Sequence, residues 1–505
     1  MHLLLHFTRK NFINNILHCV LFLILSTHQI EIPLTLSSIS NHANYIRYSG
    51  MLNSVDYKLL TGEFFIGTPK QSLNLLLDTT SSVSWIPKSN LNNYFMHTFD
   101  PSRSKTFFNF GTSKDAPYED LIQKGELSAD VMDFTTQKRN KQLAPNFHFI
   151  LVDSEEEPNS KVTGFDGTMS LLRHDHIKNI ERKSLSSYNT DELTGYSLPE
   201  YLAQEHVINR NKFAIEFLPN NHSTLYIDEE ELLNEIISNK NNTSGKCSFN
   251  KDFNQNWHCL IKSINIKHTL EPKQNKNIKL LSNEYAILDS SQPYIIAPRR
   301  SGLSILEYYR SLYIGCSIFS KYDTYTFLVC RGNYFNVTNI PKLCITLGNK
   351  EICLENEDLF YTGYEEITQD SLYVFKLIVF EFDNDEWKFG LPVFYKRMVM
   401  FDNDLNQITF VDVNEYTDNV HNYNKRKVLL QKEDKTIYIK RIYVYIIILI
   451  IIMICVMLGV YSKHNGLHCR ISNKKNNFHI NKVTTNLVNS KTNAVELKEI
   501  INSDC

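Results

Sequence analysis

Two segments far apart in the chain share one pattern, an apolar run that ends in an aspartate and is followed by hydroxyl residues. The first segment, LNLLLDTTSSVSWIP, contains Asp78, and the second, AILDSSQPYIIAP, contains Asp289. In each segment a proline follows the aspartate by nine positions, Pro87 in the first and Pro298 in the second. Apolar runs of this kind indicate buried strands. A carboxyl group at the end of a buried strand needs hydrogen bonds to its charged form or a shifted pKa.

The repetition indicates two similar lobes, each of which supplies one carboxyl group to a shared cleft. Two carboxyl groups about 3 Å apart cannot both be ionised, so one keeps a proton and the other acts as a base. Such a pair activates a water molecule between its members and protonates a leaving amine. We therefore predict that Asp78 and Asp289 are catalytic residues.

The residues around both aspartates resemble the active-site segments of the pepsin-like aspartic proteases (peptidase family A1), including the plasmepsin branch. FFIGTPKQ, a spacer of six residues and DTTSSVSWIP are similar to the first segment of that family, and the residues around Asp289 are similar to the second. The resemblance covers residues 52–413. It implies an all-β, bilobal pepsin-like fold with the cleft between two β lobes, aspartic-type endopeptidase activity on a peptide or protein substrate, and no cofactor or metal.

The same resemblance implies which hydroxyl groups support the aspartates. Thr79 and Ser290 correspond to the residues whose hydroxyls brace the two loops against each other. Ser81 corresponds to the hydroxyl that donates to the outer oxygen of the first carboxylate, that of Asp78.

Other matches to the family lie on both sides of the first aspartate. The segment 118–131 resembles the hairpin flap that folds over the cleft, and it places Tyr118 at the flap tyrosine. Trp85 falls where the family has the indole that hydrogen-bonds this tyrosine, although both could instead be ordinary core aromatics. Gly167 in FDGTMSL and Gly390 in FGLPVF are interpreted as equivalent glycines of the two lobes.

The sequence departs from the family pattern beside both aspartates. Thr80 and Ser291 stand where the family has glycine, and Gln292 stands where it has a hydroxyl residue. A side chain in place of glycine keeps the backbone N–H but adds bulk, and it strains the turn if φ is positive there. Two hypotheses follow: a membrane-anchored aspartic endopeptidase, or a catalytically inactive protease-like membrane protein that binds peptide or protein partners.

The two ends of the chain predict a membrane protein. Residues 1–26 carry two basic residues and then an apolar run, which indicates a signal peptide, with an uncleaved anchor as the alternative. Residues 442–461 contain no charge, and these 20 residues of helix would span about 30 Å, one hydrocarbon core. We therefore predict a transmembrane helix there and entry into the secretory pathway.

The orientation is decided by the N-terminal signal. The stalk at 414–441 carries seven Lys and Arg residues, whereas the near part of the tail at 462–505 carries four, namely Lys463, Arg470, Lys474 and Lys475. By itself the positive-inside rule would therefore place the stalk in the cytosol. Because large domains translocate largely regardless of charge, we predict a single-pass type I protein with a lumenal or extracellular body and a cytosolic tail.

The remaining boundaries follow from the resemblance. Residues 27–51 are expected to form a short propeptide or a linker. Residues 52–228 form the predicted N-terminal lobe with the first aspartate loop and the flap, and residues 229–413 form the C-terminal lobe with the second aspartate loop.

The cysteines suit an oxidising compartment. Six of the ten lie in the body, namely Cys247, Cys259, Cys316, Cys330, Cys344 and Cys353. CITLGNKEIC is typical of a hairpin that turns at Gly348-Asn349 and places Cys344 opposite Cys353, so we predict a disulfide between them. No body cysteine has zinc-site spacing. The chain also holds glycosylation sequons at Asn221, Asn241, Asn242 and Asn336.

Several other classes of function find no support. His174-Asp175-His176 is a candidate metal clip, but no further ligand follows at helical or hairpin spacing, and a solvated loop is favoured. The net charge of −2 gives no reason to expect a nucleic-acid partner. We found no P-loop, Rossmann, GxSxG or HExxH motif, and we expect a monomer.

Overall fold

The computed structural model describes much of the body of the 505-residue chain. The described residues are 30–39, 57–91, 95–118, 121–134, 144–155, 164–173, 197–218, 223–228, 243–248, 256–268, 272–280, 284–321, 325–335, 340–364, 370–380 and 386–413. All of them lie in one unit, Met1–Asn414, and their regular structure is mostly strand. The predicted all-β class is confirmed for this part of the chain.

The first sheet contains thirteen described strands. They are β1 (Ile30–Ile39), β2 (Tyr57–Ile66), β3 (Gln71–Asp78), β4 (Trp85–Pro87), β5 (Phe108–Tyr118), β6 (Leu121–Asp133), β7 (Ala144–Glu155), β8 (Thr168–Ser170), β9 (Lys212–Phe217), β10 (Ser223–Ile227), β11 (Thr243–Ser248), β23 (Arg397–Asp402) and β24 (Gln407–Asp412). Their order in the sheet is β11-β24-β23-β9-β10-β1-β2-β3-β8-β4-β7-β6-β5.

The second sheet contains eleven described strands, all from the predicted C-terminal lobe. They are β12 (His258–Lys267), β13 (Lys276–Ile278), β14 (Tyr285–Leu288), β15 (Ile295–Ala297), β16 (Cys316–Lys321), β17 (Tyr325–Arg331), β18 (Lys342–Leu347), β19 (Lys350–Leu354), β20 (Phe360–Tyr364), β21 (Ser371–Phe380) and β22 (Trp387–Phe389). The order is β16-β17-β21-β15-β22-β14-β12-β18-β19, with β13 beside β12 and β20 beside β21.

Helices are short and few among the described residues. The α-helices are α2 (Leu198–Gln204), α4 (Arg299–Leu312), α5 (Asn356–Leu359) and α6 (Leu391–Phe394). Single 3-10 turns occur at Ser89–Leu91, Pro101–Arg103, Pro272–Gln274 and Gly332–Tyr334.

A strand lies inside the region 27–51, where the sequence predicted a propeptide or linker. β1 pairs with β2 on one side and with β10 on the other, so it is an interior strand of the first sheet. Ile30, Ile32 and Leu34 are buried at alternate positions, and this period of two is the signal that the interpretation overlooked. The folded body therefore begins before residue 52.

Asp78 is the last residue of β3 and Asp289 directly follows β14, and the two strands belong to the same four-strand arrangement. In the first lobe β3 runs parallel to β8, β8 pairs antiparallel with β4, and β4 runs parallel to β7. In the second lobe β14, β22, β15 and β21 repeat these three pairings with the same directions. The duplication indicated by the two aspartate segments is thus present in the strand pairings.

The pairings correct the correspondence predicted for Gly390 and Gly167. β8 pairs with β4 through Thr168, and β22 pairs with β15 through Lys388, each opposite the residue seven positions after its aspartate. Thr168 is therefore the equivalent of Lys388, and Gly390 corresponds to Ser170. The prediction was wrong because it aligned two glycines, whereas equivalence in a sheet is set by strand register.

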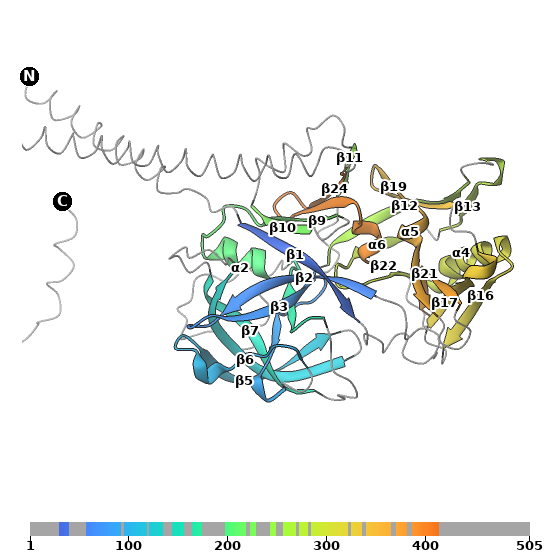
Figure 1. Cartoon of the computed structure of the whole chain (residues 1–505). Coiled ribbons are helices and arrows are strands. Elements are labelled where there is room, and N and C mark those ends of the chain that lie inside the picture. Colours follow the sequence, from blue (N-terminus) through green and yellow to red (C-terminus); the bar gives the residue numbers. More distant parts are fainter. Residues whose placement is uncertain are drawn as a thin grey trace, which may run out of the picture. The chain divides into compact units, whose positions relative to one another are not determined.

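The first sheet joins strands from both predicted lobes. β23, orange in Figure 1, pairs along its whole length with the green β9, from Arg397 opposite Phe217 to Asp402 opposite Lys212. β24 and β11 continue the sheet beyond β23. The two lobes are therefore connected by continuous backbone hydrogen bonding.

An aromatic cluster packs where the lobes meet. Phe213 of β9 stacks on Phe401 of β23 at a centroid distance of 4.7 Å, and Trp257 contacts both rings at 5.7 and 5.0 Å. The Trp257 indole also donates to the carbonyl of Leu171, just after β8, at 3.0 Å. A buried Trp satisfied in this way fixes the second lobe against the segment that follows β8 in the first lobe.

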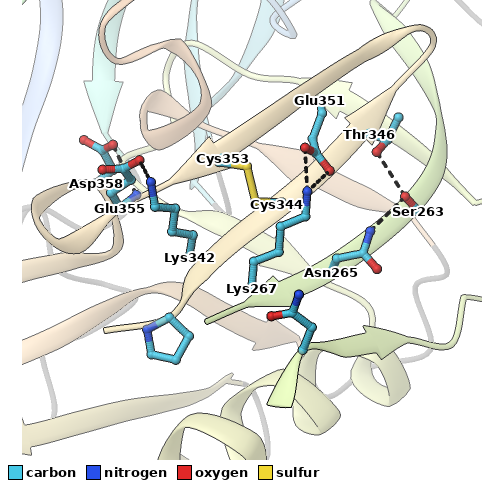
Figure 2. The surroundings of a disulfide bond; sticks show 12 residues. Ser263, Asn265, Lys267, Lys342, Cys344, Thr346, Glu351, Cys353, Glu355 and Asp358 are labelled. Carbon is cyan, nitrogen blue, oxygen red and sulfur yellow. Dashed lines mark hydrogen bonds and ion pairs between the residues drawn. A yellow bond between two sulfur atoms is a disulfide. The ribbon is translucent and has the colours of Figure 1, made fainter. Parts of the chain in front are cut away.

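Disulfide bonds join neighbouring segments of the second lobe. The described residues contain Cys247–Cys259, Cys316–Cys330 and Cys344–Cys353. The predicted bond between Cys344 and Cys353 is present, and these residues are register partners in the β18–β19 hairpin. Figure 2 shows this disulfide beside the ion pair between Lys267 and Glu351, whose charged atoms lie 2.7 Å apart.

Several predictions concern residues outside the described part of the chain. These are the signal peptide at 1–26, the stalk at 414–441, the membrane span at 442–461, the tail at 462–505, the four sequons and the His174–His176 cluster. Within the described residues, no helix combines the length and the apolar character needed to cross a membrane.

We expect Gly390→Ala to destabilise the protein. A Cβ at this position would lie 2.2 Å from the carbonyl oxygens of both Gln292 and Tyr294. The Gln292 carbonyl already accepts a hydrogen bond from the N–H of Leu391 at 2.8 Å. The backbone at Gln292 therefore cannot move away from the new Cβ without weakening this hydrogen bond. Urea denaturation should show a loss of about 2–3 kcal/mol in unfolding free energy. In the control Gly111→Ala the Cβ meets no atom within 4 Å and only the φ of +68° is unfavourable, so about 1 kcal/mol is expected; equal losses would contradict the account.

Candidate active site

The carboxylate of Asp78 is held by the loop that follows β3. One of its oxygens, Oδ1, accepts hydrogen bonds from the backbone N–H of Thr80 at 2.7 Å, the Thr80 hydroxyl at 2.8 Å and the backbone N–H of Ser81 at 2.8 Å. The residue is 5 % exposed. Three donors to one oxygen stabilise the negative charge of this buried carboxylate.

Asp289 occupies the equivalent position after β14 but has fewer donors. Its Oδ1 accepts from the Ser291 N–H at 3.0 Å and from the Ser291 hydroxyl at 2.6 Å. The N–H of Gln292 instead donates to the main-chain carbonyl of Asp289, at 3.3 Å. Asp289 is 2 % exposed, so this carboxyl group is both more buried and less supported than that of Asp78.

Hydroxyl groups of each loop bond the backbone of the other loop. The hydroxyl of Thr79 donates to the Leu288 carbonyl at 2.7 Å and accepts from the N–H of Ser290 at 3.0 Å. The Ser290 hydroxyl donates to the Leu77 carbonyl at 2.8 Å. Because Leu77 and Leu288 immediately precede the two aspartates, these bonds hold the aspartates side by side. The structure thus gives Thr79 and Ser290 the geometry that the family resemblance implied.

The pKa of Asp289 reflects this setting. Burial is the main cause that raises it, and the neighbouring charge of Asp78 raises it further, whereas the hydrogen bonds from Ser291 and the charge of Lys388 oppose the shift. The pKa rises from 3.8 to about 6. Below about pH 6 the carboxyl group of Asp289 is therefore mostly protonated.

The residues in place of the family's glycines add donors to the site. The hydroxyls of Thr80 and Ser291 both turn onto the carboxylate oxygen that already receives the backbone N–H of the same residue. Neither residue is among the described residues with positive φ. The turns therefore accept side chains without left-handed backbone, and the added bulk does not separate the two loops.

Ser81 supports the site in a different way from the expected one. Its hydroxyl donates to the carbonyl of Val83 at 2.8 Å, and only its backbone N–H reaches Asp78. Sequence reasoning overlooked Ser170, whose hydroxyl donates to the Ser81 carbonyl at 2.6 Å and whose N–H donates to the Ser84 hydroxyl at 3.0 Å. The register of β8 beside β3, which pairs Ser170 with Asp78, is the signal that would have found it.

The structure describes the side chain of Trp85 but only the backbone of Tyr118. Trp85 is buried and packs edge-on against Phe95 and Phe165, at centroid distances of 6.0 and 6.4 Å. Tyr118 is the last residue of β5 and the register partner of Leu121 in β6, so it lies at the turn of a hairpin. The side chain of Tyr118 lies outside the described part of the chain, and its bond to Trp85 stays a prediction.

The described residues offer one group of possible metal ligands, and it does not fit an ion. Cys344, Cys353 and Glu351 lie within 4.8 Å of one another, but the two cysteines form a disulfide and Glu351 is paired with Lys267. Disulfide sulfurs are not the thiolates that bind metals.

Replacing Asp289 should change how stability depends on pH. Since its folded-state pKa of about 6 exceeds 3.8, Asp289 stabilises the fold fully only below about pH 4, and this contribution is lost as pH rises through 6. We expect wild type to lose on the order of 3 kcal/mol relative to Asp289→Asn between pH 4 and pH 7. Urea denaturation of both proteins across this range measures the difference; parallel curves would show that Asp289 is not perturbed.

Comparison with known proteins agrees with this geometry. The family model described as eukaryotic aspartyl protease matches residues 60–413, and this range includes both aspartate loops. The chain is 34 % identical to gastricsin of Oryctolagus cuniculus over 113 residues, which cover 22 % of this chain and 28 % of the relative. It is 31 % identical to chymosin of Camelus dromedarius over 163 residues, 30 % of this chain and 36 % of the relative. These alignments span about a third of each relative, whereas the family match extends over most of the chain. The chain therefore belongs to the eukaryotic aspartyl protease family.

Proposed function

We propose that this chain is an aspartic endopeptidase, of the plasmepsin-like branch, that hydrolyses peptide bonds with a water activated between Asp78 and Asp289. The observation that carries the proposal is the bracing of the two loops by Thr79 and Ser290, because it brings two buried carboxyl groups together. A pair of this kind has an acid and a base at the same pH only if its members differ in environment.

We assign the two roles from the difference in hydrogen-bond donors. Asp78, with three donors to Oδ1, is the base that takes a proton from the attacking water. Asp289, with its raised pKa, is the acid that gives its proton to the oxygen of the scissile carbonyl. As the C–N bond then breaks, Asp78 passes the proton taken from water to the leaving amine, and the former carbonyl oxygen returns its proton to Asp289. This assignment predicts activity below about pH 6, where Asp289 stays protonated.

The substrate in this proposal is an extended peptide beneath the β5–β6 hairpin. The hairpin pairs Tyr118 with Leu121 at its turn and is continued by β7 on its other side. A flap of this kind would exclude water from the site and hold the scissile bond over the two carboxyl groups.

We propose further that the protein enters the secretory pathway and is held in a membrane by residues 442–461. The three disulfide bonds support passage through an oxidising compartment, because such bonds are rare in reducing ones. In this proposal the body is lumenal or extracellular, the protein is a glycosylated monomer, and the tail is cytosolic.

The test is cleavage of a mixed peptide library by the purified full-length protein in detergent. We expect cleavage at pH 4–5, inhibition by a statine-type transition-state mimic, and a loss of about a thousandfold or more in Asp78→Ala and in Asp289→Ala. The control Asp370→Ala, which removes the carboxylate bonded to Asn333 in the second lobe, should keep full activity.

The other hypothesis is a binding protein that has lost catalysis. It is favoured if wild type and both alanine variants give the same background of cleavage while peptides still bind. The departures at Thr80 and Ser291 are the reason to make this comparison, since no glycine remains beside either aspartate.

A further inference from the structure

Lys388 is a cation on the strand next to the second aspartate. In the sheet it lies between two isoleucines, Ile287 of β14 and Ile296 of β15, which are its register partners on either side. Register partners in a sheet project their side chains to the same face, and residues two apart on a strand share a face. Asp289, two positions after Ile287, therefore projects to the same face as Lys388, and its N–H continues the ladder to the Phe389 carbonyl at 3.0 Å.

This face is slightly less buried than the other face of the three strands, although Ile296 packs in a second hydrophobic cluster. Ile296 is 9 % exposed and Ile287 is 4 % exposed, while Lys388 is half-buried. The residues that alternate with them project to the other face and belong to the main hydrophobic core: Ala286, Leu288, Ile295, Ala297, Trp387 and Phe389. A half-buried lysine on the face to which Asp289 projects can meet a ligand that lies over Asp289.

The ammonium group of Lys388 has no acidic partner among the residues that the structure describes. The ion pairs of the second lobe involve other lysines, such as Lys342 with Glu355 and Lys350 with Asp412. Lys388 is nevertheless close enough to Asp289 for its charge to oppose the rise in the pKa of that carboxyl. Because Lys388 is half-buried, water screens its charge less than that of an exposed lysine, so it attracts an anion more strongly.

The first lobe has no cation at the corresponding position. Thr168, the equivalent of Lys388 by strand register, is fully buried. The two halves of the site therefore differ in charge, with the positive charge beside Asp289 and not beside Asp78.

We propose that Lys388 is a specificity-determining residue that binds an acidic side chain of the peptide, close to the scissile bond and on the Asp289 side. This inference rests on the proposed function in that the ligand is a peptide bound across the two aspartates, but it does not require that the peptide be cleaved. The preferred substrates are then peptides that carry Glu or Asp at one position next to the bond that is cut.

The test uses binding, so that it is independent of catalysis. A set of statine-containing peptides places either Glu or Gln at each of the positions that flank the statine, and binding to the full-length protein in detergent is measured by fluorescence anisotropy at pH 6. At one position the Glu peptide should bind about five- to tenfold more tightly than the Gln peptide. At pH 3 the preference should disappear, because the glutamate is then neutral.

Variants of the lysine decide the cause of the preference. Lys388→Met should bring the Glu-to-Gln affinity ratio to about one, Lys388→Glu should invert it, and Lys388→Arg should retain it. Thermal unfolding checks that each variant is folded. The matched control is Lys267→Met, which removes an exposed lysine paired with Glu351 and should leave the ratio unchanged.

The outcomes separate this inference from the proposed function. An unchanged ratio in Lys388→Met, or no preference for Glu at any position in wild type, would overturn the role of Lys388. A preference that depends on Lys388 in a protein that cuts no peptide would support the inference and remove proteolysis alone. Absence of binding by every peptide would overturn both.

Discussion

The candidate active site depends on the hydroxyl of Thr79, which bonds the first aspartate loop to the second. This hydroxyl bonds both the carbonyl before Asp289 and the amide after it, and the Ser290 hydroxyl returns one bond to the first loop. Each bond contributes about 1 kcal/mol net, but an unsatisfied buried partner would cost about 1–3 kcal/mol, so the loops are held in one relative position. The sheet shared by β9 and β23 and the stacking of Phe213 on Phe401 keep the lobes in the arrangement that these bonds require.

The departures from the family pattern, Thr80 and Ser291, each add a hydroxyl donor to the neighbouring carboxylate. A hydroxyl residue next to each aspartate fills the space of a glycine, and its side chain turns onto the carboxylate instead of into the opposite loop. The donors are unequal, three for Asp78 and two for Asp289, so the near-symmetric lobes produce two carboxyl groups of different character. Lys388 adds a second asymmetry, since its counterpart Thr168 is buried and neutral.

The sequence predicted the features that depend on a few neighbouring residues. The strand-and-aspartate pattern at Asp78 and Asp289 is local, and so is the hairpin that pairs Cys344 with Cys353. The features that depend on strand register or on the direction of a side chain were harder to predict from the sequence. The mistaken match of Gly390 arose because sequence spacing does not reveal which residues pair across a sheet. The hydroxyl of Ser81 bonds its own loop because a nearby carbonyl competes with the carboxylate, and such competition is decided by geometry.

The central claim is that the two lobes place their carboxyl groups so close that the charge of Asp78 raises the pKa of Asp289. The most direct measurement is the pKa of Asp289 in wild type and in Asp78→Asn, followed by NMR of the labelled carboxyl carbon. In wild type we expect a pKa of about 6, and in Asp78→Asn a lower value that stays above 3.8, because burial remains while the neighbouring charge is gone. An Asp289 pKa that does not change on removal of the Asp78 charge would contradict a shared site.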